Sequence, residues 1–116
     1  MDEIVAEAKL LATKGVKELQ VIAQDLTYYG LDLYGRLVLP ELTERLSDIP
    51  GIEWIRRHYG YPTRFPYDLL RVMRERDNVC KYLDIALQHV SDRVLKYMRR
   101  QVTHRKTVGL IERIRE

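Results

Sequence analysis

Residues 19–23 have the sequence LQVIA, residues 52–59 have IEWIRRHY, and residues 82–87 have YLDIAL. Each run is short and rich in the β-branched, aromatic and aliphatic residues that favour strands. Segments with helical spacing of apolar residues stand before, between and after these runs. Strands that begin about every 30 to 35 residues and alternate with helices are typical of βα units. The sequence therefore predicts an α/β fold of three parallel strands with flanking helices, joined by right-handed crossovers.

Apolar residues that recur every three or four positions predict amphipathic helices between these strands. The helices are expected over residues 2–14, 39–49, 66–77, 91–98 and 103–114. Gly15 stands where the first helix would take a left-handed cap, and Ser91 and Thr103 are the expected N-caps of the last two helices. Residues 24–36 are predicted to form a long connection, of a length that is often functional.

The composition is that of a globular domain. The chain has 116 residues, 46% of them hydrophobic, which is ample for one core. Twenty Lys and Arg against 17 Asp and Glu give a formal net charge of +3, which neither requires nor excludes nucleic acid. Cys80 is the single cysteine, so no intrachain disulfide can form. With no signal-peptide pattern and no long apolar run, we expect a cytoplasmic chain with no membrane partner and a buried Cys80 thiol.

Polar side chains stand at or just beyond the carboxyl end of each predicted strand. They are Gln24, Asp25, His58, Gln88, His89 and Ser91. In parallel α/β structures the loops at this edge converge on one mouth and hold the functional groups. Strand alternation also places Tyr82, Asp84 and Gln88 on one face of the third run, which makes that face too polar for a dry core. The pattern indicates a polar cleft that holds a ligand.

A purely structural explanation of these residues is also open. Asp84 would then be a buried partner of Arg56, and His58 or His89 would be satisfied within the core. The sequence has no phosphate-binding glycine loop, no convincing Ser-His-Asp order and no pair of His or Cys residues with zinc-ligand spacing. The residues alone therefore lead only to an α/β ligand-binding domain.

Three stretches resemble one enzyme family. They are residues 21–30, VIAQDLTYYG; residues 54–62, WIRRHYGYP; and residues 84–92, DIALQHVSD. They are similar to the barrel of radical S-adenosylmethionine methylthiotransferases, and most similar to the branch that modifies an aspartate of a small-subunit ribosomal protein. In the branch that modifies tRNA the first motif usually has Gly-Gln-Asn and the third Gln-Ser-Gly-Ser, whereas this chain has AQD at 23–25 and QHVS at 88–91. Ala86 departs from the proline common in the family, which puts the local turn in doubt.

The resemblance implies that residues 1–116 are a partial radical S-adenosylmethionine domain. It would be an excerpt of a TIM-like (βα) barrel that lacks the cysteine-motif strand and the final strands. The parent enzyme would insert a methylthio group at the β-carbon of an aspartate in a small-subunit ribosomal protein, its substrate and partner, using S-adenosyl-L-methionine and [4Fe–4S] clusters. The cluster ligands would lie outside this chain, which would have no catalytic or metal-ligating residue and be inactive alone.

The resemblance also implies a cofactor-binding set. Gln24 and Asp25 stand where the family holds the amino end of the cofactor's methionine, and Arg100 stands where a basic group meets its carboxylate. The other members of the set are His58, Gln88, His89 and Ser91, the last three on the ribose side. Arg100 would otherwise be a solvated charge at a helix end.

Two other functions stay open. One is a tRNA methylthiotransferase of the same superfamily. The other is a non-catalytic RNA-binding α/β module, in which the basic cluster between Lys96 and Lys106 acts with several loop tyrosines by charge and stacking. These tyrosines are Tyr28, Tyr29, Tyr59 and Tyr61. Because an opened barrel leaves strand edges unpaired, we further expect the chain to self-associate through exposed sheet edges.

Overall fold

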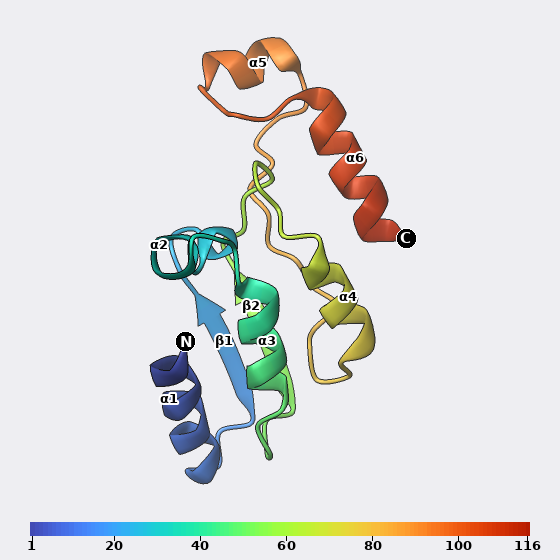
Figure 1. The fold of residues 1–116 in the computed structure, drawn as a ribbon. Coiled ribbons are helices and arrows are strands. Elements are labelled where there is room, and N and C mark those ends of the chain that lie inside the picture. The colour runs from blue at the N-terminus through green and yellow to red at the C-terminus, as the bar shows by residue number, and fades with distance from the viewer.

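Two parallel strands, β1 (Glu18–Ile22) and β2 (Trp54–His58), form the sheet of the computed structural model, which describes residues 1–116 (Figure 1). Their register places Glu18 opposite Trp54 and Ile22 opposite His58, so the two carboxyl ends lie at one edge. The predicted α/β class and the parallel pairing of the first two strands are confirmed.

The helices lie close to their predicted ranges. They are α1 (Asp2–Thr13), α3 (Leu39–Ser47), α4 (Asp68–Glu75), α5 (Asp92–Tyr97) and α6 (His104–Arg115). Thr103 caps α6 as predicted, because its side chain accepts a hydrogen bond from the backbone N–H of Lys106. Ser91 occupies the N-cap position of α5, but its side chain makes no capping hydrogen bond.

The predicted long loop between β1 and α3 contains two short helices, η1 (Leu26–Tyr28) and α2 (Leu31–Tyr34). Asp25 begins the first of them, since its Oδ1 accepts a hydrogen bond from the backbone N–H of Thr27 at 3.1 Å. Gly30 separates the two helices with φ +90°, and a Cβ there would lie 2.1 Å from Cγ2 of Val38. The segment is therefore a folded connection that requires glycine at its centre.

The third predicted strand, residues 82–87, is not formed, so the predicted three-stranded sheet is wrong. In place of a ladder, the segment after α4 has two isolated parallel bridges, one from Val79 to Ile55 of β2 and one from Ile85 to Gly60, just beyond the end of β2. The first pair is 24 residues apart in sequence and the second 25, so the register shifts by one residue between them. Within this gap Nη2 of Arg57 donates to the carbonyl oxygens of Cys80 and Tyr82, at 3.0 and 3.2 Å. A side chain thus uses carbonyl groups that a continuous ladder would need.

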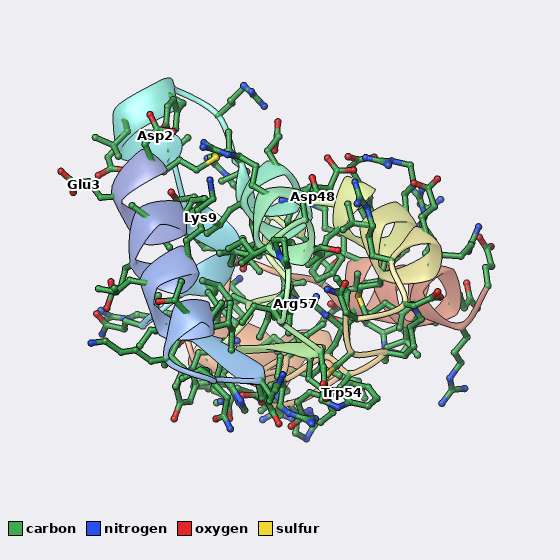
Figure 2. The ribbon with its side chains drawn as sticks, turned by 90° about the horizontal axis from the view of Figure 1, so that it is seen from below. Asp2, Glu3, Lys9, Asp48, Trp54 and Arg57 are labelled. Atoms are coloured by element: carbon green, nitrogen blue, oxygen red, sulfur yellow. The ribbon has the colours of Figure 1, made fainter.

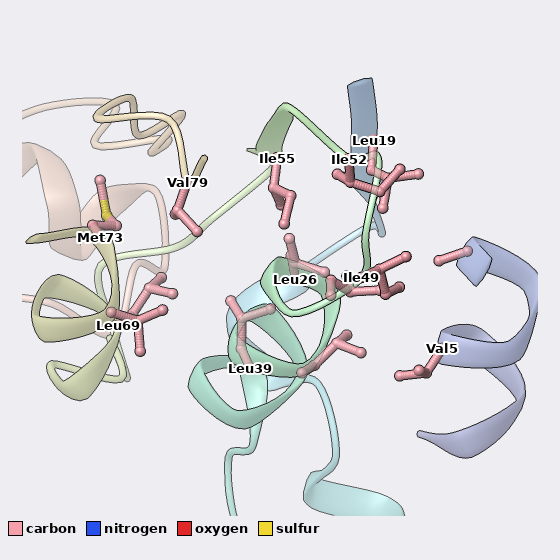
Figure 3. Packing of buried hydrophobic residues seen from close by; sticks show 14 of the residues in the cluster. Val5, Leu19, Leu26, Leu39, Ile49, Ile52, Ile55, Leu69, Met73 and Val79 are labelled. Carbon is pink, nitrogen blue, oxygen red and sulfur yellow. The ribbon is translucent and has the colours of Figure 1, made fainter. Parts of the chain in front are cut away.

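The core lies on one face of the sheet. Leu19 and Ile55 point from the strands toward α3, where Leu42 and Leu46 are each at most 2% exposed (Figure 3). Helices α1 and α4 extend this cluster on either side, through Val5 and residues such as Leu69 and Val72. The opposite face, which we call the open face, carries exposed and half-buried side chains. It comprises Glu18, Gln20, Ile22, Trp54, Arg56 and His58.

Helices α5 and α6 lie beyond the carboxyl edge of the sheet, and the C-terminal end of α6 comes near α4 (Figure 1). Leu110 of α6 is 1% exposed and belongs to the main core, and the Arg113 guanidinium lies 4.2 Å from the ring centroid of Tyr67. The chain is elongated, with extents of 50 × 30 × 20 Å. This arrangement brings the end of α5 back toward the loops that follow β1 and β2.

Candidate functional site

The segments that follow β1 and β2 are tied together at the carboxyl edge of the sheet. The backbone N–H of Leu26 donates to the carbonyl oxygen of Tyr59 at 2.9 Å, and the N–H of Gly60 donates to that of Asp84 at 2.8 Å. Three segments that are distant in sequence are therefore held side by side at this edge, where parallel sheets place their binding sites.

A surface hollow of about 200 Å³ opens beside this edge. We call it the Asp25–Arg100 hollow. Its lining residues are Asp25, Tyr28, Tyr61, Thr63, Arg99, Arg100 and Gln101. The carboxylate comes from the start of η1, and the two arginines come from the end of α5. Two of the predicted cofactor residues, 75 positions apart in a chain of 116, thus border one cavity.

Arg100 is held in place by two contacts. Its Nη2 donates to the carbonyl oxygen of Ala86 at 2.5 Å, and its guanidinium carbon lies 5.0 Å from the ring centroid of Tyr61. A guanidinium has five N–H donors, so most of them stay available to an anionic ligand. With the Asp25 carboxylate across the hollow, the site offers a negative group for the ammonium of an α-amino acid and a positive group for its carboxylate.

The turn that carries Arg99 and Arg100 has a left-handed residue at its centre. Arg99 has φ +55°, its N–H donates to Lys96 O at 3.1 Å, and the Arg100 N–H donates to Leu95 O at 2.9 Å. This is a Schellman end in which arginine takes the position that usually belongs to glycine. The local backbone is strained where it presents both arginines to the hollow.

His58 lies on the open face and does not border this hollow. Its Nδ1 is 3.8 Å from Oδ2 of Asp84, which also accepts the backbone N–H of Tyr59 at 3.1 Å. The alternative that Asp84 pairs with Arg56 is wrong, because Nε of Arg56 donates to Oε1 of Glu18 at 3.0 Å. The Arg56–Glu18 pair therefore joins β2 to β1, whereas Asp84 meets His58 from a segment that forms no strand.

The other predicted site residues are exposed or half-buried and lie outside the hollow. Gln24 follows β1 and is exposed, and Gln88 is exposed with φ +65°. Nδ1 of His89 accepts the backbone N–H of Ser91 at 2.9 Å, which forms a local turn before α5. The structure therefore brings Asp25 and Arg100 together and leaves these residues in the loops around them.

The chain is similar over its whole length to part of several curated proteins. It is 70% identical over 115 residues to the ribosomal protein uS12 methylthiotransferase RimO of Parabacteroides distasonis, covering 99% of this chain and 27% of that protein. It is 66% identical over 116 residues to the protein of that name from Bacteroides thetaiotaomicron, covering 100% and 27%. For Porphyromonas gingivalis the identity is 63% over 115 residues, covering 99% and 26%. The chain is homologous to one segment of the uS12 methylthiotransferases. It spans about a quarter of the length of these relatives, and no protein-family model matches it.

These methylthiotransferase relatives bear the name of the ribosomal-protein branch that the motifs at residues 21–30 and 84–92 indicated. Sequence reasoning about the cofactor missed some lining residues of the hollow, namely Tyr28, Tyr61, Thr63 and Gln101. Tyr61 and Thr63 come directly after β2, so the position rule that selected Asp25 would have selected them too.

The RNA-binding hypothesis fits the tyrosines only in part. Tyr28 and Tyr61 border the hollow, and Tyr59 is 56% exposed. Tyr29 packs against the core with its hydroxyl buried and unpartnered, and burial raises the pKa of this phenol above its ordinary value. Tyr29 is therefore a packing residue and not a base-stacking platform.

No cluster of three or more His, Cys, Asp or Glu residues is arranged to ligate an ion. Cys80 is a free thiol and is buried, as predicted. None of the helices is long and apolar enough to cross a membrane.

Proposed function

We propose that this chain forms part of the radical S-adenosylmethionine domain of a methylthiotransferase that modifies an aspartate of ribosomal protein uS12. The observation that carries the proposal is the 70% identity over 115 residues to a protein of that name. Because the chain spans 27% of that relative, the proposal covers one part of the enzyme. Residues 1–116 would be a partial barrel, and the ligands of the [4Fe–4S] clusters belong to other residues of the full enzyme.

The donor set of the Asp25–Arg100 hollow fits the methionine end of S-adenosyl-L-methionine. When bound, this cofactor supplies the radical chemistry that activates an unreactive C–H bond. Asp25 would accept hydrogen bonds from the cofactor's ammonium group, and Arg100 would donate to its carboxylate. Tyr61 and the Ala86 carbonyl hold the guanidinium of Arg100 in position. Their task is to bind and orient the ligand.

The remaining predicted contacts are proposed on their position alone. Gln24, Gln88, His89 and Ser91 stand in loops at the same edge of the sheet, and His58 stands at the end of β2 on the open face. From these places Gln24 would join Asp25 at the amino end of the cofactor's methionine, and Gln88, His89 and Ser91 would line its ribose side. The substrate would be the ribosomal protein, which places the full enzyme in the cytoplasm.

A calorimetric titration of S-adenosyl-L-methionine into the chain tests the cofactor site. We expect Asp25→Asn and Arg100→Met each to weaken binding roughly tenfold or more, because each removes a charge-assisted hydrogen bond. Asp32→Asn and Arg93→Met, which change exposed residues outside the hollow, are the matched controls. Equal affinities for all four variants would show that the hollow is not the cofactor site.

The alternative function is that of a non-catalytic RNA-binding module, and binding of RNA by the chain would favour it. Four lining residues of the hollow suit it, because Tyr28 and Tyr61 are aromatic and Arg99 and Arg100 are basic. Binding of a single-stranded RNA that weakens steeply with salt would support that function. No binding at low salt would remove it and leave the cofactor site as the use of the hollow.

A further inference from the structure

Arg57 is a buried cation that the proposed function does not use. It lies on β2 with its side chain toward the core, and only 3% of the residue is exposed (Figure 2). Its Nη2 donates to the carbonyl oxygens of Cys80 and Tyr82, whereas Nε and Nη1 have no hydrogen-bond partner. Three of its five N–H bonds are therefore buried and unpaired.

No carboxylate compensates this charge. None of the ion pairs of the chain includes Arg57. Burial lowers the pKa of Arg57 to about 10, so the guanidinium stays charged at neutral pH. A buried charge without a partner is among the most costly features a folded chain can contain. The two carbonyl oxygens supply dipoles but no negative charge.

A small cavity, partly open to solvent, adjoins this arginine. It has a volume of about 20 Å³, which is room for one small ligand. Besides Arg57, its wall includes Leu26, Leu39, Phe65 and Leu69, all nearly inaccessible to solvent. Asp84 also borders it, but Oδ2 of this residue accepts the backbone N–H of Tyr59. The polar part of the wall also includes Thr27 and His58, whose Nε2 is likewise buried without a partner. Arg57 supplies three unpaired N–H donors and the one permanent positive charge of this wall.

We propose that this cavity binds a single monovalent anion of the halide type, such as chloride, as the counter-ion of Arg57. Water would satisfy one or two N–H bonds and leave the charge uncompensated. A larger oxyanion requires more room than this cavity has. A halide combines one negative charge with a polarisable surface that tolerates apolar neighbours. The anion would fix the segment after α4 against β2, where the ladder is interrupted.

Thermal unfolding of the chain at constant ionic strength tests this site. Chloride replaces gluconate stepwise, so that general screening by salt does not change. Because a ligand of the folded state stabilises by mass action, we expect a rise of about 5 °C in the unfolding midpoint per tenfold increase in chloride above half-saturation. A midpoint that does not change with chloride would overturn the proposal and assign the cavity to water.

Two variants locate the response. Arg57→Met keeps a side chain of similar length without the charge, and we expect it to fold and to lose the chloride response. Arg93→Met removes an exposed cation and should keep the response of the unchanged chain. A chloride response of equal size in Arg57→Met would overturn the assignment.

Crystals of the unchanged chain grown in bromide give a second and direct measurement. We expect one anomalous scattering peak within hydrogen-bond distance of Nε or Nη1 of Arg57. This result stands even if Arg57→Met does not fold. Absence of the peak in crystals grown at a bromide concentration that saturates the thermal response would overturn the proposal.

Discussion

Nη2 of Arg100 donates a hydrogen bond of 2.5 Å to the carbonyl oxygen of Ala86. The contact joins the end of α5 to the segment in which Ile85 pairs with Gly60, just after β2. Arg100, which we propose as a cofactor ligand, is thereby coupled to the backbone beside the sheet edge. The position of the guanidinium in the hollow depends on this contact as much as on α5 itself.

Replacement of Arg100 should therefore reduce stability as well as binding. We expect Arg100→Met to lower the free energy of unfolding by about 1–2 kcal/mol, because the Ala86 carbonyl loses a charged donor. Denaturant unfolding measures the change, with the exposed Arg93→Met as control. An unchanged midpoint for Arg100→Met would show that the contact contributes nothing to folding.

Two helix ends with the same hydrogen-bond pattern give a matched pair of substitutions. After α1, Gly15 has φ +89°; its N–H donates to the carbonyl oxygen of Ala12, and the N–H of Val16 donates to that of Leu11. Arg99 occupies the equivalent position after α5, with φ +55°. We expect Arg99→Gly to stabilise the chain by about 1 kcal/mol and Gly15→Ala to destabilise it by about as much. Thermal unfolding checks both, and effects of the same sign would contradict the strain assigned to Arg99.

The ion pair between Asp68 and Arg71 predicts a dependence of stability on acid. The hydrogen bond from Arg71, with Nε to Oδ1 at 2.8 Å, holds the pKa of Asp68 below its ordinary value of 3.8. A lowered folded-state pKa means that this contribution is complete above 3.8 and is lost as the pH falls through the folded value.

We therefore expect the free energy of unfolding to fall more steeply below pH 3.8 in the unchanged chain than in the Asp68→Asn variant. The difference should be small because solvent screens both exposed groups. Asp77→Asn, at an exposed carboxylate outside the ion pairs, should follow the unchanged chain. If Asp68→Asn shows the same pH dependence as the unchanged chain, the Asp68–Arg71 pair does not link stability to pH.

The helices and the α/β class could be predicted because both depend on local pattern. Apolar spacing placed α1 and α3 within two residues of their observed ends, and Thr103, as an N-cap residue, indicated the start of α6. The third strand could not be predicted reliably. Alternation over residues 82–87 is local, whereas pairing with β2 depends on Arg57, whose side chain takes the carbonyls of Cys80 and Tyr82.

The candidate site was predictable to a similar degree. The rule that functional groups follow parallel strands selected Asp25, and the family resemblance added Arg100. The contact of Arg100 with Tyr61 depends on how α5 turns back toward the sheet, which no spacing within α5 specifies. Long-range geometry of this kind is decided by packing of the whole chain.

The exposed side of the sheet predicts self-association. β1 pairs only with β2, so its other edge is free, and Ile22 on the open face is 58% exposed. We expect the sedimentation coefficient to rise with concentration, and Ile22→Lys to suppress the rise. Leu10→Lys is the control, since Leu10 is 55% exposed on α1. A concentration-independent monomer would contradict this expectation.

We propose that this chain works as one segment of a uS12 methylthiotransferase. The most direct measurement replaces the matching segment of the Parabacteroides distasonis enzyme with these 116 residues, at 70% identity over 115 positions, and follows uS12 by mass spectrometry. We predict that the chimaera adds the mass of a methylthio group to one uS12 aspartate, and that Asp25→Asn and Arg100→Met each lower the yield at least tenfold while Asp32→Asn does not. A folded chimaera that carries its clusters but modifies tRNA, or modifies neither molecule, would contradict the account.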